Sequence, residues 1–269
     1  MEAVVGRIRD CGFTGAESKT CKLFSFGGNS FRINASYDSE SRMEAVVGGI
    51  GGCCSTKAEP KTWNGSFFLL GGIHLVIMLI TIESRGSRNT EQSICDVDLN
   101  RSYPYKWNKK YSICIRFPGI SKECELELKS YTDYLVKNKI QGFVTLHSYE
   151  GFILYPWGYQ KKLYTDDREN LYKLGEEMRN AIENISGADY DVGQSADILY
   201  RANGYSNDYA KSLGIKYVFT IEIGSRKMYN FGFIIPKSYI SKLAEEAFAE
   251  ILVVSQKILK ENIVESNIK

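Results

Sequence analysis

The chain has 269 residues, 43% hydrophobic and 25% charged, which is the balance of an ordinary globular protein with room for one large α/β domain or two small ones. Its formal net charge of +2 gives no reason to expect a nucleic acid or an acidic membrane surface as a partner. Histidine is scarce, so a site that needs two imidazoles can use only His74 and His147.

The first part of the chain, residues 1–61, is rich in Gly, Ser and Cys and repeats the sequence MEAVVG. No apolar stretch typical of a signal peptide opens it, so we expect either an intracellular chain or an incomplete start. Residues 22–26 and 30–33 are expected to form edge strands joined by a turn at Gly27 and Gly28. We treat 1–61 as a divergent segment without an assigned structure, preceding a catalytic domain over 62–269.

Residues 67–82 are the most apolar stretch, reading FFLLGGIHLVIMLITI. Strands of a mostly parallel sheet are apolar on both faces, so this pattern predicts two buried strands joined at Gly71 and Gly72. The stretch is slightly short for a membrane span, and a membrane anchor is the minority alternative.

Downstream, helical periodicity alternates with short apolar runs. Helices are predicted over 121–139, 166–185, 206–213 and 238–259, with a cap at Ser121 and a stop at Gly187. Strands are predicted over 142–146, 151–155 and 215–223. This alternation predicts an α/β domain with a mixed sheet.

Two titratable residues interrupt the predicted strands. His147 ends the first strand, where sites of α/β proteins usually lie, although an isolated histidine there is more often a hydrogen-bonded core residue. Glu222 lies inside an apolar strand, where a carboxylate is costly unless it is paired or functional. It is either a general base or a strand-end carboxylate that faces solvent.

Asn100, Arg101 and Tyr200 lie in predicted loops. The planar guanidinium of arginine suits a carboxylate, and asparagine adds a donor. Taken alone, such residues are usually solvated or pack on the surface.

The motifs together resemble those of the zinc carboxypeptidases of the carboxypeptidase A/B family. They are GGIH at 71–74, DLNR at 98–101, TLHSY with ILYPWGY within 145–159, GIKYVFTIEI at 214–223 and FGFIIP at 231–236. They follow the family's order from about residue 66 to 250. The resemblance implies an α/β fold with a mixed, largely parallel sheet flanked by helices.

The resemblance also implies a zinc-dependent enzyme that hydrolyses the C-terminal peptide bond. His74 and His147 match zinc ligands, and Glu222 matches the carboxylate that takes the proton of the attacking water. Asn100 and Arg101 match the pair that holds the terminal carboxylate.

Further matches are less central. Tyr200 matches a tyrosine that closes over the bound terminus, and Tyr149 a substrate-side contact. Arg85 is the best match for the arginine that polarises the scissile carbonyl. Cys95 and Cys114 match the family's disulfide.

The chain departs from the family after the first histidine. Ile77 stands where the family's HxxE motif has a glutamate ligand, and a block of sheet and helix is missing, so we expect a truncated fold. Two imidazoles form a weak zinc site. The alternative function is therefore a catalytically impaired member, a pseudoenzyme or an incomplete gene model, that at most binds peptide C-termini.

Asn207 occupies the position that sets side-chain preference in the family. Because it is neutral and polar, we expect a preference for neutral or apolar C-terminal residues over Lys and Arg. The resemblance further implies a secreted monomer that acts on peptides, without nucleic acid or membrane partners.

Overall fold

The computed structural model describes residues 19–26, 29–37, 43–48, 65–70, 73–79, 97–109, 116–225, 232–233 and 235–268. Near the N-terminus, β1 (Lys19–Phe26), β2 (Asn29–Tyr37) and β3 (Met43–Gly48) form an antiparallel sheet in the order β1-β2-β3. The strands on both sides of Gly27 and Gly28 are confirmed. The prediction that both are edge strands is wrong for β2, because the second MEAVVG copy forms β3 and pairs with it.

The central sheet has six strands in the order β4-β5-β6-β9-β7-β8. They are β4 (Gly65–Leu70), β5 (Ile73–Leu79), β6 (Gly142–Glu150), β7 (Phe152–Tyr155), β8 (Asp191–Gln194) and β9 (Tyr217–Ser225). The pairs β5–β6, β6–β9 and β7–β8 are parallel, whereas β4–β5 and β7–β9 are antiparallel. The predicted mixed, largely parallel sheet is confirmed, and the apolar stretch forms two strands rather than a membrane helix.

The helical elements lie close to their predicted positions. They are η1 (Leu99–Arg101), α1 (Leu126–Lys137), α2 (Arg168–Ser186), α3 (Ser195–Ile198), α4 (Ser206–Ser212), η3 (Lys237–Tyr239) and α5 (Ile240–Ile268). Gly187 ends α2 in the left-handed conformation, as predicted.

Two predicted helix boundaries are wrong. α1 begins at Leu126 rather than near Ser121, because Gly119 and Glu123 have positive φ and the chain still turns there. α5 continues past residue 259 to Ile268, since no glycine or proline stops it. Its last turns leave the core, and Ile263 and Val264 are exposed.

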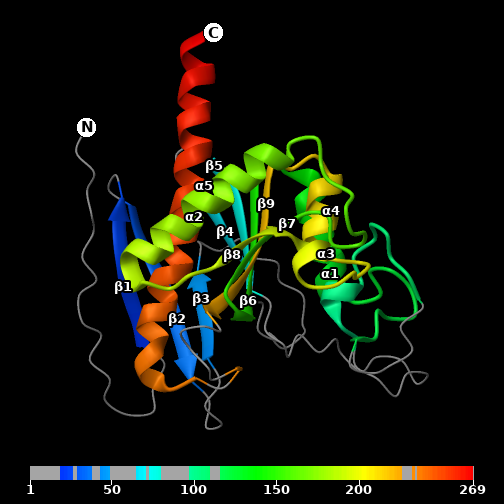
Figure 1. The fold of residues 1–269 in the computed structure, drawn as a ribbon, viewed down its shortest axis with the longest axis horizontal. Helices are drawn as coiled ribbons and strands as arrows, with labels where there is room; N and C mark the ends of the chain where they lie inside the picture. The colour runs from blue at the N-terminus through cyan, green and yellow to red at the C-terminus, as the bar shows by residue number, and fades with distance from the viewer. Residues whose placement is uncertain are drawn as a thin grey trace, which may run out of the picture.

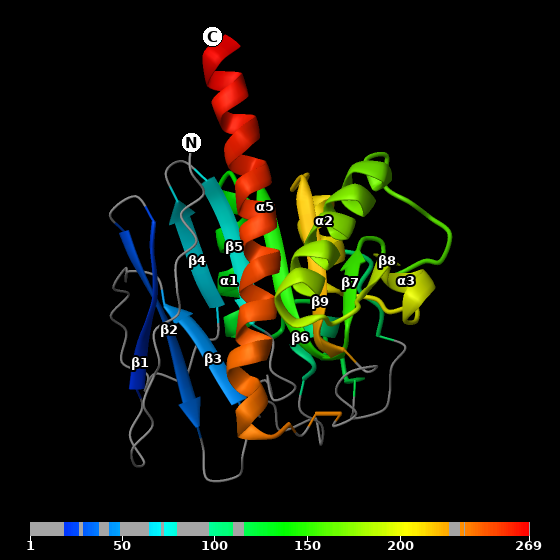
Figure 2. The same cartoon turned by 60° about the vertical axis from the view of Figure 1, so that its left-hand side comes forward.

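Helices cover both faces of the central sheet (Figures 1 and 2). Along β6 and β9 the side chains alternate between the two faces. On β6, Val144 and Leu146 pack in the core shared with α2 and α5, whereas Phe143 packs with α1 and α4. On β9, Phe219 belongs to the first core and Val218 to the second. This alternation assigns every second residue of β6 and β9 to the α1 and α4 face.

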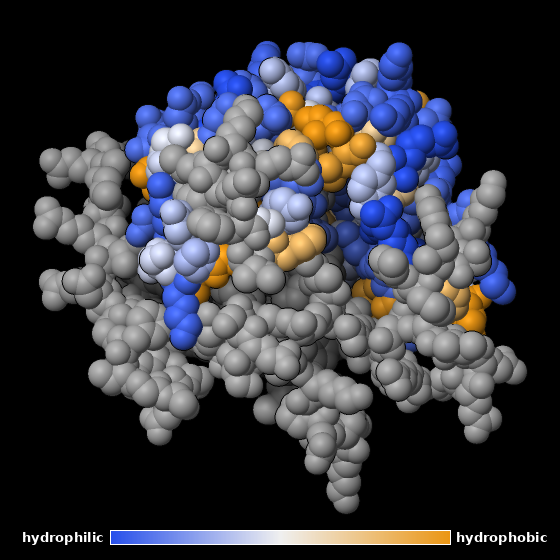
Figure 3. Space-filling view, turned by 60° about the horizontal axis from the view of Figure 1, so that its bottom comes forward, coloured by the Kyte–Doolittle hydropathy of each residue, from blue (hydrophilic) through white to orange (hydrophobic). Residues whose placement is uncertain are grey.

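No helix in the described part of the chain is long and apolar enough to cross a membrane. Figure 3 shows one face of the molecule, on which the described hydrophobic residues form small patches separated by hydrophilic ones. Such scattered apolar exposure is ordinary for a folded protein.

Candidate functional site

His147 and Glu222 face each other across two adjacent parallel strands. They are register partners on β6 and β9, near the carboxyl ends of both. His147 follows Phe143 and Thr145 in the alternation, and Glu222 follows Val218, so both side chains project to the α1 and α4 face. The hydroxyl of Thr145 lies 3.1 Å from Nε2 of His147. The sheet therefore presents an imidazole and a carboxylate together at one edge.

Asn100 and Arg101 come from the short turn η1, which a side chain holds in place. The carboxylate of Asp98 caps this turn by accepting from the main-chain N–H of Asn100 at 3.0 Å. Oδ1 of Asn100 then accepts from the N–H of Ser206 at 3.0 Å, which ties η1 to the start of α4. Both Asn100 and Arg101 are buried, so the turn is a rigid part of the structure.

The guanidinium of Arg101 is surrounded by polar and aromatic partners. It donates to the carbonyl of Asn100 at 2.8 Å and to the hydroxyl of Tyr200 at 3.1 Å. Its carbon lies 4.5 Å from the ring centre of Tyr205, a cation–π arrangement. Tyr200 itself is 37% exposed, and Arg116 covers its ring. The cation is thus fixed in orientation beside a tyrosine that reaches solvent.

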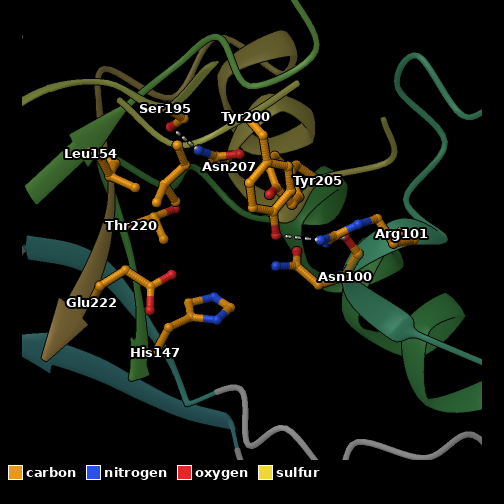
Figure 4. A pocket seen from close by; sticks show the side chains of 11 residues that line it. Asn100, Arg101, His147, Leu154, Ser195, Tyr200, Tyr205, Asn207, Thr220 and Glu222 are labelled. Atoms are coloured by element: carbon orange, nitrogen blue, oxygen red, sulfur yellow. Dashed lines mark hydrogen bonds between the residues drawn. The ribbon is translucent and has the colours of Figure 1, made fainter. Parts of the chain in front are cut away.

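These groups line one cavity of about 120 Å³. Figure 4 shows Arg101 and Asn100 on one side of it, His147 and Glu222 on another, and Ser195 and Asn207 at a third. Its lining residues are Asn100, Arg101, His147, Leu154, Ser195, Leu199, Tyr200, Tyr205, Asn207, Thr220 and Glu222. The cavity therefore combines a cation, a carboxylate, an imidazole and a partly apolar wall.

Burial sets the protonation of the two strand residues. It raises the pKa of Glu222 to about 8, with a further contribution from the negative charge of Glu150 and an opposing one from Arg101. It lowers the pKa of His147 to about 4, and the positive charge of Arg101 acts in the same direction. At neutral pH the imidazole is neutral, which is the form that binds metals.

Asn207 and Asp208 at the start of α4 are held by buried hydrogen bonds. Asn207 donates through Nδ2 to the hydroxyl of Ser195 at 3.1 Å. The carboxylate of Asp208 accepts from the N–H groups of Gly158 and Tyr159 at 2.7 and 2.9 Å. Burial raises the pKa of Asp208 to about 7, although these two hydrogen bonds oppose the shift. α4 is thereby anchored to the loop after β7.

The main chain of His74 lies far along the strands from that of His147. Leu75 pairs with Gly142, so His74 lies level with Gln141 at the amino end of the parallel pair β5–β6. At about 3.3 Å per residue, the distance from there to His147 along the strand is about 20 Å. Two ligands of one zinc ion must both lie about 2 Å from the metal. This separation concerns the main chains of β5 and β6, and a zinc site shared by the two histidines stays a prediction.

The described residues do not fit a zinc site on their own. They contain no group of three or more His, Cys, Asp or Glu side chains that could hold a metal ion. His147 and Glu222 supply two donors, whereas a catalytic zinc takes three protein ligands.

The remaining predicted residues are placed as follows. Tyr149 packs edge-on against Phe233, with ring centres 4.7 Å apart, and is not among the described residues that line the cavity. Arg85, Cys95 and Cys114 lie outside the described residues.

The comparisons with known proteins identify one family. The family model described as zinc carboxypeptidase matches residues 80–250, more than half of the chain. The chain belongs to the zinc carboxypeptidase family.

Individual carboxypeptidases align with a large share of the chain. Carboxypeptidase O of Bos taurus is 33% identical over 63% of this chain, and carboxypeptidase B2 of Mus musculus is 37% identical over 57% of it. The solved bovine thrombin-activatable fibrinolysis inhibitor, in complex with tick carboxypeptidase inhibitor, superposes with a TM-score of 0.60 at 30% identity. That match covers 66% of this chain and 62% of the other.

This zinc carboxypeptidase family member matches only part of its relatives. The chain covers 46% of the length of bovine carboxypeptidase O and 38% of the length of mouse carboxypeptidase B2. The family match begins at residue 80, after β5 and therefore after His74. Family membership implies zinc as the cofactor, and the described residues of this chain do not complete the site that would hold it.

Several lining residues were not found from the sequence. Tyr205 stacks on Arg101, and Ser195 and Thr220 bring hydroxyl groups into the cavity. Nothing in the local sequence marks Ser195, since its role depends on α4 bringing Asn207 within hydrogen-bond distance. Thr220 could have been found by alternation, because it lies two residues before Glu222 on β9.

Proposed function

We propose that this chain is a metallocarboxypeptidase that hydrolyses the C-terminal peptide bond of peptides and proteins. The observation that carries the proposal is that Arg101 and Glu222 line one cavity. A fixed guanidinium suits the terminal carboxylate of a peptide, and a buried carboxylate nearby suits proton transfer at the adjacent peptide bond.

The binding step rests on the residues around Arg101. A terminal carboxylate that enters the cavity would accept from the guanidinium and from the side-chain amide of Asn100, while the exposed ring of Tyr200 lies at the rim. Because the carboxylate exists only at the end of a chain, this contact fixes the register and restricts cleavage to the last residue.

The proton-transfer step rests on Glu222. Because burial raises the pKa of Glu222 to about 8, its ionised form prevails only above that pH. In that form its carboxylate would take a proton from the water that attacks the scissile carbonyl and pass it to the leaving amine nitrogen. Zinc would polarise that carbonyl in a complete family site. Since the described residues do not complete such a site, the roles proposed here are restricted to binding and proton transfer.

The second candidate function is binding of peptide C-termini without hydrolysis. The position of His74, at the opposite end of β5 from the site, favours it. In this case the peptide carboxylate would still be held by Asn100, Arg101 and Tyr200. The bound peptide would not be hydrolysed.

Zinc content and cleavage, measured together, decide between the two. About one zinc retained after dialysis, lost in His147→Ala, with cleavage of C-terminal residues that is lost in Glu222→Gln, would support the peptidase. No retained zinc and no cleavage, with Arg101-dependent peptide binding, would support the binding protein. Absence of both cleavage and binding would rule out both candidates.

We also propose a secreted monomer, as the family resemblance implies. Static light scattering of the purified chain should give the mass of one 30.5 kDa protomer. A dimer mass would contradict the monomer, and retention of the protein inside cells that express its native gene would contradict secretion.

A further inference from the structure

The cavity has a polar end away from His147, formed by Ser195 and Asn207 (Figure 4). Both side chains are 2% exposed, so their hydrogen bonds are fixed by the fold rather than by solvent. Their arrangement determines which chemical groups a bound side chain can present there.

The orientation of the Asn207 amide follows from a main-chain donor. The N–H of Asp208 donates to Oδ1 of Asn207 at 2.8 Å. A main-chain N–H can only donate, so this atom must be the oxygen and the other must be the nitrogen. The amide cannot flip without losing that buried bond.

The nitrogen of Asn207 then uses one of its two hydrogens. It donates to Oγ of Ser195 at 3.1 Å, and Ser195 in turn donates its own hydrogen to the carbonyl of Tyr155 at 3.0 Å. The two hydrogen bonds are therefore donated in one direction, from Asn207 to Ser195 and from Ser195 to Tyr155. The second amide hydrogen of Asn207 has no partner among the described residues, so the lining presents a donor.

Apolar and hydroxyl groups line the rest of this part of the cavity. Leu154 and Leu199 offer an apolar wall to an aliphatic stem, and the hydroxyl of Thr220 can accept or donate. Arg101 is the only arginine or lysine among the described lining residues, and Glu222 lies on the same cavity. A second negative charge on the ligand would therefore have no cation of its own.

We propose that Ser195 and Asn207 make this site selective for a C-terminal glutamine. The side-chain carbonyl of glutamine would accept from Asn207, its amide would donate to Thr220, and its two methylenes would pack on Leu154 and Leu199. Methionine has the same length without the hydrogen bonds, glutamate adds an uncompensated charge, and lysine directs an ammonium at a donor.

This inference rests on the proposed binding of peptide C-termini at Arg101. From the sequence we expected a preference for any neutral or apolar C-terminal residue, and the present inference restricts that preference to glutamine. One neutral hydrogen bond to a buried donor corresponds to a preference of roughly fivefold to tenfold.

The test is calorimetric binding of pentapeptides whose last peptide bond is a reduced CH2–NH link, so that no hydrolysis can occur. We expect the peptide ending in glutamine to bind roughly fivefold to tenfold more tightly than its methionine counterpart. In Asn207→Leu, which keeps a similar volume without the donor, the ratio should fall to about one. The comparison of the two peptides on the unaltered protein needs no variant and stands even if Asn207→Leu fails to fold.

Arg101→Ala separates this inference from the proposed function. Equal or tighter binding of the methionine peptide, with binding still dependent on Arg101, would overturn the glutamine preference and leave C-terminal recognition intact. Absence of peptide binding, or binding indifferent to Arg101, would overturn both.

Discussion

Gly204 packs directly against the main chain of Arg101. A Cβ atom at Gly204 would overlap the carbonyl oxygen of Arg101, and Gly204 has a φ of +68°. Its own carbonyl accepts from the N–H of Tyr103 at 3.2 Å. The position of Arg101 therefore depends on a glycine about one hundred residues away in sequence.

Gly204→Ala should destabilise the protein by about 3 kcal/mol, since the left-handed backbone costs about 1–2 kcal/mol and the overlap adds a similar amount. Gly214→Ala is the matched control, because Gly214 has a φ of +84° and nothing within 4 Å of an added Cβ. Gly214→Ala should therefore be destabilised only by the cost of the left-handed backbone, about 1–2 kcal/mol. Urea unfolding of both variants measures the difference, and equal losses would show that the contact with Arg101 is unimportant.

Arg101→Lys keeps the positive charge and removes the planar fork. We expect peptides with a free C-terminus to bind about 10-fold to 100-fold more weakly, since charge-assisted hydrogen bonds contribute about 1.5–3 kcal/mol. Calorimetry on the same peptide with an amidated C-terminus is the control, and its weak binding should not change. An equal loss for both peptides would mean that Arg101 does not contact the carboxylate.

Asp208→Ala removes the acceptor of two main-chain N–H groups and leaves that of Gly158 buried without a partner. The expected loss is about 2–4 kcal/mol of unfolding free energy. Asp197 also accepts from a main-chain N–H and a hydroxyl, of Lys162 and Tyr164, but at the surface. Asp197→Ala should therefore lower the free energy of unfolding by less than about 1 kcal/mol. Thermal unfolding of both variants measures the two losses, and a loss for Asp197→Ala as large as that for Asp208→Ala would contradict the argument from burial.

Glu250 on α5 is fully buried, and neither carboxylate oxygen has a hydrogen-bond partner among the described residues. Burial raises its pKa well above the ordinary value of 4.5, and the charge of Glu246 adds to the shift. The folded protein then binds a proton that the unfolded chain releases, so stability falls as pH rises above about 4.5, by about 1.4 kcal/mol per pH unit.

Glu250→Gln mimics the protonated side chain and should remove this loss. The free energy of unfolding of the variant should match that of the wild type near pH 5 and exceed it increasingly as the pH rises toward 7. Unfolding curves at both pH values measure the effect, with Glu265→Gln on the exposed end of the same helix as the control. A constant difference across pH would show that Glu250 titrates normally.

Sequence periodicity was sufficient for the elements with strong local signals. α2 has apolar residues at helical spacing and a glycine stop, and both its ends lie within two residues of the prediction. The beginning of α1 was missed because the turn at Gly119 and Glu123 competes with the cap expected at Ser121. The end of α5 was missed because the helix continues to Ile268, beyond the last of its buried residues.

The site was less predictable, because most of its residues are placed by tertiary contacts. Motif resemblance identified Arg101, His147 and Glu222, which line the same cavity. It also paired His74 with His147, and the register of β5 against β6 separates them. A motif records which residues occur, whereas the register of a strand is set by its neighbours and the preceding turn.

Asn100 and Arg101, proposed above to bind the carboxylate, make contacts of very long sequence separation, to Ser206 and Tyr200 respectively. Closing such loops is entropically expensive, so these contacts are expected late in folding, after the strands have paired. The unfolded chain would then offer no binding surface at all. A peptide at 100 times its dissociation constant should therefore stabilise the fold by about 2.7 kcal/mol. Ligand-induced protection against heat would report the integrity of the whole domain, even for a chain without catalytic turnover.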